Sequence, residues 1–228
     1  MSLNPNISEV VSLLGETSRA TILSSLMDGR FHTASELALM AAIKPQTASF
    51  HLAKLVGGNL VKVEKHGRYR YYQLANKEVA ELVESLLGAS PAPKVHSLRE
   101  SSQLKLLQEA RTCYDHLAGR LGVRITEAML HAGYLEKGEK EFVVTDIGEQ
   151  FFSEFGLNLD EVRRNRRSFA RACLDWSERH HHLAGALGTS LMNRFIELGW
   201  IAQMPTTRAV KVTARGTAGF KEYFHIEI

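Results

Sequence analysis

Two cysteines and two histidines recur at matching places in the second half of the chain. Cys113 and His116 lie in the segment 110–122, and Cys173 and His182 lie in a segment that echoes it. Residues three apart on a helix share a face, so we expect Cys113 and His116 to point the same way. Two thiolates and two imidazoles form a soft tetrahedral donor set, suited to zinc, cadmium or lead.

Neighbouring residues leave two interpretations of this set open. Asp115 and Asp175 could orient the histidines as outer partners of a metal site. Free cysteine is also among the most buried residue types and packs as a small hydrophobe, so a purely structural role is the alternative. Residues 176–181 of the second copy have no counterpart in the first. This insertion separates Cys173 from His182 along the chain and weakens the metal interpretation.

The same residues also include the types found in a nucleophilic triad, namely Cys113, Asp115 and His116. On a helix, however, Asp115 would lie across from Cys113, and triads are normally assembled from separate segments. The chain contains no G-x-S-x-G turn, glycine-rich phosphate loop or H-E-x-x-H motif. We therefore expect no enzyme activity, and keep a cysteine-dependent enzyme only as the weaker alternative.

The cysteines and histidines belong to an internal duplication. A cysteine, a histidine, L-A-G-x-L-G and V-T-x-x-G recur in the same order in residues 97–157 and 158–228. Each copy is predicted to read helix, helix, short strand, helix, with strands at 142–145 and 210–213. Thr145 and Thr213 should cap the helices that follow. A basic run from Arg163 to Arg171 is predicted to be a solvated helix face.

A second group of polar residues lies in residues 33–74. Thr33 and Glu36 have capping-box spacing at the start of a short amphipathic helix. Pro45 suits the first turn of the next helix, where its missing N–H costs nothing. The apolar positions of that second helix form an inner stripe: Ala48, Leu52 and Leu55.

Two β-rich runs, 60–64 and 69–74, follow the second helix and are joined by a turn that contains Gly67. Helix, turn, helix and basic hairpin together predict a winged helix-turn-helix, whose second helix enters the major groove. Lysines and arginines would contact phosphates, and polar residues of the helix would read base edges. The predicted DNA contacts are Lys44, Gln46, Thr47, Ser49, Phe50, His51, Lys54, Lys65, Arg68 and Arg70.

The segment Leu14-Gly-Glu-Thr-Ser-Arg-Ala-Thr-Ile-Leu resembles the L-G-D-P-T-R-L-R-I-L signature of the arsenic-repressor (ArsR) family. Residues 47–55 resemble the recognition helix of that family, and residues 67–74 resemble its wing. The resemblance implies a dimeric bacterial transcription regulator, usually a repressor released from DNA by a metal or another small effector. Phe50 stands where the family often has arginine. Its ring either contacts a thymine methyl group or is buried.

The resemblance also implies a dimer interface made by the first helix and by the helix that Asn76 should cap. The places where the family commonly carries metal ligands hold none here. The helix predicted at 35–42 has no cysteine, and the helix after Asn76 has neither histidine nor cysteine. Any metal would therefore have to bind in the duplicated part.

Composition limits the class of protein. The 228 residues are 44% hydrophobic and carry a formal net charge of only +3, so DNA binding must rest on local clusters such as the wing. Two cysteines do not make a disulfide scaffold and suit a reducing cytoplasm. No signal peptide is visible, and no apolar run reaches the roughly 18 residues of a membrane span. We expect a cytoplasmic protein with no membrane partner.

We predict a mainly α fold with short β-hairpins (α+β). Residues 1–87 form a winged helix-turn-helix domain for DNA binding and dimerisation, after a loose terminus at 1–6. Residues 88–96 are a proline-containing linker, and residues 97–228 form a pseudo-symmetric effector or assembly domain. The expected function is a homodimeric, sequence-specific regulator of transcription, a repressor that binds a pseudo-palindromic operator on double-stranded DNA until an unidentified small effector releases it. The alternative is a sensor of zinc, cadmium or lead that uses Cys113 and Cys173.

Overall fold

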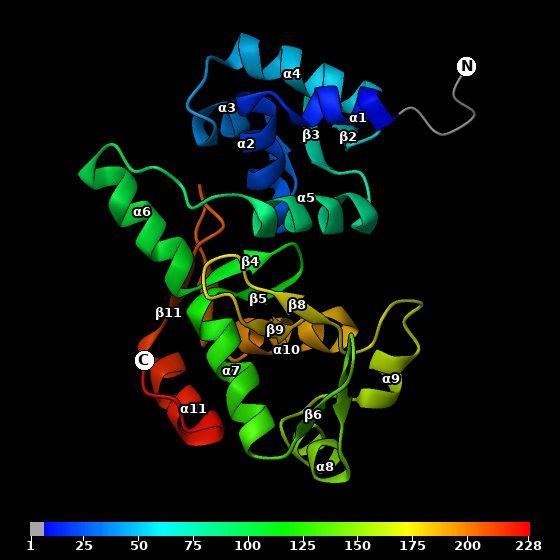
Figure 1. The fold of residues 1–228 in the computed structure, drawn as a ribbon, viewed down its shortest axis with the longest axis vertical. Helices are drawn as coiled ribbons and strands as arrows, with labels where there is room; N and C mark the ends of the chain where they lie inside the picture. Colours follow the sequence, from blue (N-terminus) through cyan, green and yellow to red (C-terminus); the bar gives the residue numbers. More distant parts are fainter. Residues whose placement is uncertain (1–6) are drawn as a thin grey trace. The chain divides into compact units, whose positions relative to one another are not determined.

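The computed structural model describes residues 7–228, so the terminus predicted at 1–6 lies outside the described part. The chain divides into two compact units. Of the described residues, one unit comprises 7–87 with 205–207, and the other comprises 88–204 with 208–228. In Figure 1 they run from blue to cyan and from green to red. Between residues 7 and 228, no helix has the length and apolar character that a membrane crossing requires.

The first unit is a winged helix. Its elements are α1 (Ile7–Leu14), α2 (Thr17–Ser25), the 3₁₀ turn η1 (Leu26–Asp28), β1 (His32–Thr33), α3 (Ala34–Met40), α4 (Pro45–Gly57), β2 (Val61–His66), β3 (Tyr69–Leu74) and α5 (Lys77–Ala89). The strands form an antiparallel sheet in the order β1-β3-β2. Pairing of His66 with Tyr69 leaves Gly67 and Arg68 as the hairpin turn. The predicted α+β fold with a winged helix-turn-helix is confirmed.

Local capping sets the helix boundaries of this unit as the sequence predicts. Thr33 accepts a hydrogen bond from the Glu36 amide, and the Glu36 carboxylate accepts one from the Thr33 amide. Asn76 accepts one from the amide of Val79 at the start of α5. The inner stripe of α4 is fully buried: Ala48, Leu52 and Leu55.

A buried carboxylate fixes the turn that leads into the helix-turn-helix. Asp28 Oδ2 lies 2.7 Å from His32 Nε2 and accepts a hydrogen bond of 2.8 Å from Arg30 Nε, while Oδ1 accepts one from the Arg30 amide. Burial raises the pKa of Asp28, but His32 and Arg30 outweigh it and hold that pKa below its usual value. His32 itself belongs to β1 and pairs with Tyr72 of the wing.

Asp28→Ala should therefore destabilise the first unit by about 2 kcal/mol, because it removes the acceptor of the buried His32 ring and an ion-pair partner of the half-buried Arg30. Native-state hydrogen exchange of peptides from η1, β1 and α3 measures this loss, since local opening sets their protection. Glu64→Ala on exposed β2 is the control and should change protection little. Equal protection in wild type and Asp28→Ala would show that the turn does not depend on Asp28.

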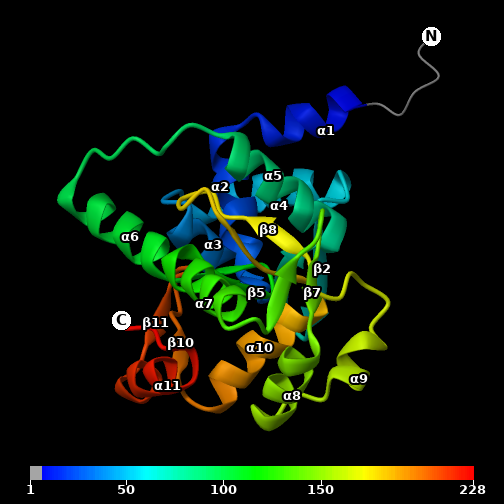
Figure 2. The ribbon, with the colours of Figure 1, turned by 60° about the horizontal axis from the view of Figure 1, so that its bottom comes forward.

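The second unit is built from hairpins and helices. Its elements are α6 (Leu98–Glu109), β4 (Arg111–Cys113), β5 (His116–Ala118), α7 (Gly119–His131), β6 (Leu135–Lys137), β7 (Phe142–Val144), α8 (Asp146–Glu154), α9 (Leu159–Arg163), β8 (Ala172–Leu174), β9 (His181–Leu183), α10 (Gly185–Glu197), β10 (Ile201–Gln203), β11 (Val210–Val212) and α11 (Ala214–Phe224). Figures 1 and 2 both place α8 near α9, and Figure 2 shows α11 beside β10 and β11.

Each copy of the duplication reads hairpin, helix, hairpin, helix. The first copy contains β4–β5, α7, β6–β7 and α8, and the second contains β8–β9, α10, β10–β11 and α11. A helix leads into each copy, α6 in the first and α9 in the second, so the predicted order of helix, helix, strand, helix is present but misses the hairpins. The segment with each cysteine and histidine was predicted to be helical and is a two-stranded hairpin. The predicted caps are confirmed, since Thr145 and Thr213 accept hydrogen bonds from the amides of Gly148 and Gly216.

One apolar core joins both copies of the second unit. Leu121 and Met129 of α7 and Leu187 and Phe195 of α10 are all buried within it. Gly119 begins α7 with φ +80, a left-handed conformation that favours glycine. A Cβ at Gly119 would also lie 2.7 Å from the Gln108 carbonyl oxygen. The L-A-G-x-L-G motif thus marks the passage from a strand into a helix.

Candidate metal centre and nucleic-acid interface

The predicted metal ligands lie on two equivalent hairpins of the second unit. Cys113 of β4 is the cross-strand partner of His116 of β5. Cys173 of β8 is the cross-strand partner of His182 of β9. The prediction that Cys113 and His116 share a helix face is therefore wrong. Opposite positions of an antiparallel pair bring the two side chains together just as effectively.

The insertion in the second copy does not separate its cysteine from its histidine. Residues 176–180 lengthen the turn between β8 and β9, and residue 181 is the first residue of β9. Cys173 still pairs with His182 across the hairpin. In an antiparallel hairpin, added turn residues leave the partners beyond them in register. The insertion therefore does not argue against a metal site.

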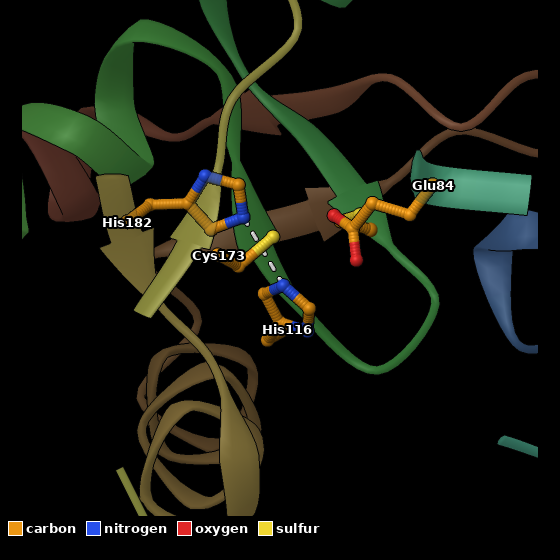
Figure 3. A group of neighbouring side chains, drawn as sticks. Glu84, His116, Cys173 and His182 are labelled. Carbon is orange, nitrogen blue, oxygen red and sulfur yellow. Dashed lines mark hydrogen bonds between the residues drawn. The ribbon is translucent and has the colours of Figure 1, made fainter. Parts of the chain in front are cut away.

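The four side chains of the second unit converge on one point. Their ligand atoms, the Sγ atoms of Cys113 and Cys173 and a ring nitrogen each of His116 and His182, all lie within 4.8 Å of one another. Figure 3 shows His116, Cys173 and His182 turned toward a common centre. All four residues are less than 5% exposed. Tetrahedral zinc, with bonds of about 2.0–2.3 Å, requires ligand separations of about 3.3–3.8 Å, so small side-chain shifts would bring all four ligand atoms to zinc distance.

The two imidazoles face each other through their Nε2 atoms at hydrogen-bond distance. Nε2 of His116 lies 3.1 Å from Nε2 of His182. Nδ1 of His116 lies 3.2 Å from Asp115 Oδ1, and Nδ1 of His182 lies 3.3 Å from Asp175 Oδ2. A carboxylate beside Nδ1 favours the proton on that nitrogen and leaves Nε2 as a lone pair. Two such lone pairs at this distance repel unless a proton or a cation lies between them.

Each orienting carboxylate is itself held by an arginine. Asp115 Oδ2 accepts a hydrogen bond from Arg167 Nη1, and Asp175 Oδ1 lies 2.8 Å from Arg111 Nη2. Burial raises the pKa of Asp115, but hydrogen bonds from His116 and Arg167 lower it to about 2. Burial also acts on Asp175, and His182 and Arg111 hold its pKa far below the usual range. Both carboxylates are therefore ionised at neutral pH.

The cysteine environment favours a thiolate. A hydrogen bond with Cys173 lowers the pKa of Cys113, and hydrogen bonds with His116 and His182 add to this effect. Together they outweigh the burial that raises the pKa, which falls well below the usual value of a thiol. A thiolate is the form that binds a metal. Both cysteines are free in the structure.

The predicted DNA contacts lie on α4 and the wing of the first unit. Most of the positions predicted on and just before α4 are exposed: Lys44, Gln46, Thr47, Ser49, Phe50 and Lys54. The predicted wing positions are exposed too: Lys65, Arg68 and Arg70. Ser49 and these three basic residues line one groove of about 570 Å³ between α4 and the hairpin. The groove thus brings a residue predicted to read bases and residues predicted to bind phosphates onto opposite walls, an arrangement that suits a DNA strand.

The structure decides whether Phe50 and His51 of α4 face solvent or the protein. Phe50 is 58% exposed and has Lys54 Nζ 4.5 Å from its ring centre, so it is not a core residue. His51 departs from the prediction, because its side chain is only 8% exposed and its Nδ1 lies 3.5 Å from the Glu16 carboxylate that caps α2. His51 therefore faces the protein, where it ties α4 to the start of α2.

The whole chain has a curated relative. It is 52% identical over 226 residues to YdfF of Bacillus subtilis (strain 168), described as an uncharacterized HTH-type transcriptional regulator, and the match covers 99% of this chain and 100% of that protein. The chain belongs to the helix-turn-helix transcriptional regulators. This DNA-binding regulator carries the winged helix that the sequence predicts, so the recognition made from its motifs is confirmed.

Solved structures resemble parts of the regulator more distantly. HlyU from Vibrio cholerae N16961 is 26% identical with a TM-score of 0.33, and the match covers 35% of this chain and 85% of HlyU. The cadmium metal-sensor CMTR from Mycobacterium tuberculosis is 26% identical with a TM-score of 0.33, covering 40% of this chain and 99% of CMTR. No protein-family model matches the regulator.

Sequence reasoning missed the arginines that complete the cluster. Arg167 was assigned to a solvated basic run, yet its Nη2 also donates to Thr189 Oγ1 at 2.6 Å while Nη1 holds Asp115. Arg111 is only 1% exposed. The signal that could have found Arg111 is its place within the duplicated segment, two residues before the cysteine, where Arg171 stands in the second copy. Arginine is seldom buried without a paired carboxylate.

Proposed function

We propose that the regulator binds a pseudo-palindromic operator as a homodimer and represses transcription in the cytoplasm until an effector releases it. The observation that carries this proposal is the exposed polar face of α4 beside the basic wing. The two recognition helices of a dimer would enter successive major grooves about 34 Å apart. Gln46, Thr47 and Ser49 would read base edges, and the lysines and arginines would neutralise phosphates.

The first unit also supports dimerisation. Helix α1 has no buried residue, and its apolar side chains Ile7 and Val11 are 75% and 57% exposed. On α5, Leu82 and Leu86 are 38% and 44% exposed. Apolar stripes of this kind on two helices are typical of surfaces that a partner covers, and a second copy satisfies the two-fold symmetry of a palindrome.

Arg68→Ala should weaken binding to specific and random DNA alike, and it should reduce the salt slope by about one unit, because one phosphate contact is lost. Fluorescence anisotropy over a range of salt concentrations, on DNA from upstream of the protein's own gene, measures both effects. Gln46→Ala is the matched comparison. It should cost about 1–3 kcal/mol on the operator and little on random DNA. An unchanged salt slope for Arg68→Ala would remove the wing from the interface.

For the effector, we propose a soft divalent metal held by Cys113, His116, Cys173 and His182. The two opposed Nε2 atoms, the lowered pKa of Cys113 and the size of the cluster support this site. A bound ion of this class would neutralise the thiolates and join the hairpins β4–β5 and β8–β9. Asp115 and Asp175 would keep both imidazoles in the tautomer that presents Nε2.

The same anisotropy assay tests the effector. Salt-sensitive binding to the operator that zinc, cadmium or lead reverses would support a metal-released repressor. DNA binding that ignores all three ions, in a protein shown by titration to bind them, would assign the cluster a structural role instead.

A further inference from the structure

A cavity of about 640 Å³ opens in the second unit, apart from the cysteine–histidine cluster. Its walls come from α7, from the β6–β7 hairpin and from the β8–β9 hairpin. Volumes of roughly 300–1,000 Å³ are typical of sites for small organic molecules. The apolar part of its lining is Leu130, Phe142 and Ala172, which also pack on the core.

The polar part of the lining is predominantly cationic. Its side chains of fixed charge are Lys137, Lys140, Arg171 and Arg179 against Glu127 and Glu139. The carboxylate of Glu127 already lies 3.0 Å from His180 Nδ1. Positive charge beside an apolar floor suits a carboxylate or phosphate group carried on an apolar body.

The cavity lies where the two copies of the duplication differ. Arg179, His180 and His181 of its lining belong to the insertion in the β8–β9 turn. Two equivalent hydrogen bonds join the copies. The Ala172 amide donates to the Lys140 carbonyl, and the Thr112 amide donates to the carbonyl of Arg208, which has the position equivalent to Lys140. There the side chain of Arg208 is buried and donates to the Thr112 carbonyl.

At the matching position of the first copy, Lys140 is exposed and its side chain lines the cavity. Divergence between the copies has thus left a space that both copies line, with more cationic than anionic side chains around it. We propose that this cavity binds a small organic anion with a carboxylate or phosphate group on an apolar body. This site is distinct from the metal cluster and from the DNA interface.

The test is calorimetric titration of the full chain with phenyl phosphate and with benzoate. Inorganic phosphate and benzyl alcohol serve as probes that keep only the charge or only the ring. We expect at least one aromatic anion to bind at one site per chain, at least about tenfold more tightly than either control probe. Tighter binding of phenyl phosphate would identify the anionic group as phosphate, and tighter binding of benzoate would identify it as carboxylate.

Lys137→Ala/Lys140→Ala should weaken that binding at least about tenfold, while Lys105→Ala on exposed α6 should leave it unchanged. A thermal unfolding midpoint equal to that of the wild type shows that the double variant is folded. The proposal is overturned if neither aromatic anion binds, if benzyl alcohol or inorganic phosphate binds as tightly, or if the double variant binds like the wild type. No DNA is present, so the result is independent of the proposed repressor function.

Discussion

Cys113→Ser/Cys173→Ser should lower the affinity for zinc or cadmium by about a thousandfold or more, because it removes both thiolates from a four-ligand site. Cobalt(II) serves as a spectroscopic probe, since its visible absorption reports tetrahedral thiolate coordination. The wild type should give that spectrum at one ion per chain, and the double variant should not. In the anisotropy assay, metal should act on DNA binding by the wild type alone.

His180→Ala/His181→Ala is the matched control for this experiment. These two histidines adjoin His182 in the chain but are exposed, so their loss should leave the cobalt spectrum and the metal affinity unchanged. A double cysteine variant that binds metal as tightly as the wild type would exclude the cluster as the metal site. The cysteines would then be core residues, as the alternative from the sequence holds.

Asp175→Asn should destabilise the second unit by about 3–5 kcal/mol, because it leaves the buried guanidinium of Arg111 without a counter-charge. Asp175 is 0% exposed and Arg111 is 1% exposed. The Asp175 carboxylate also accepts hydrogen bonds from the Gly119 amide at 2.7 Å and from Ser177 Oγ at 2.8 Å. Urea unfolding followed by tryptophan fluorescence reports this unit alone, because both tryptophans, Trp176 and Trp200, belong to it.

Asp115→Asn provides the comparison, since Asp115 has the equivalent place beside the other histidine. Its side chain is 25% exposed and its partner Arg167 is 22% exposed, so water can replace part of the lost interaction. We expect a loss of about 1 kcal/mol. Similar losses for the two variants would show that burial of Arg111 does not set the cost.

Much of the first unit could be predicted because its signals are local. Thr33 with Glu36, Pro45 and the spacing of Ala48, Leu52 and Leu55 each act within a few residues of the chain. His51 was assigned to the wrong side because its position depends on Glu16, which is distant in sequence. The side chain sits at the border of the inner stripe, where helical spacing alone does not decide between protein and solvent.

The hairpins of the second unit could not be predicted from their turns. The turn between β4 and β5 consists of Tyr114 and Asp115, and Tyr114 adopts φ 60. Hairpin turns are normally recognised by glycine or asparagine at such positions, so the segment reads as a helix. The duplication nevertheless grouped the two cysteines and two histidines that the structure brings together, because equivalent residues of two packed copies meet at their interface.

The shared cluster has a consequence for how the ligands are brought together. Each copy contributes one cysteine and one histidine, so neither copy alone holds a complete donor set. In a protein with only one copy, two chains would have to meet, and metal affinity would depend on their concentration. Joining both halves in a single polypeptide replaces that encounter with an intramolecular one at an effective concentration on the order of millimolar. Under the proposed metal site, occupancy would depend on the free ion alone and would stay the same however few molecules of the regulator a cell contains.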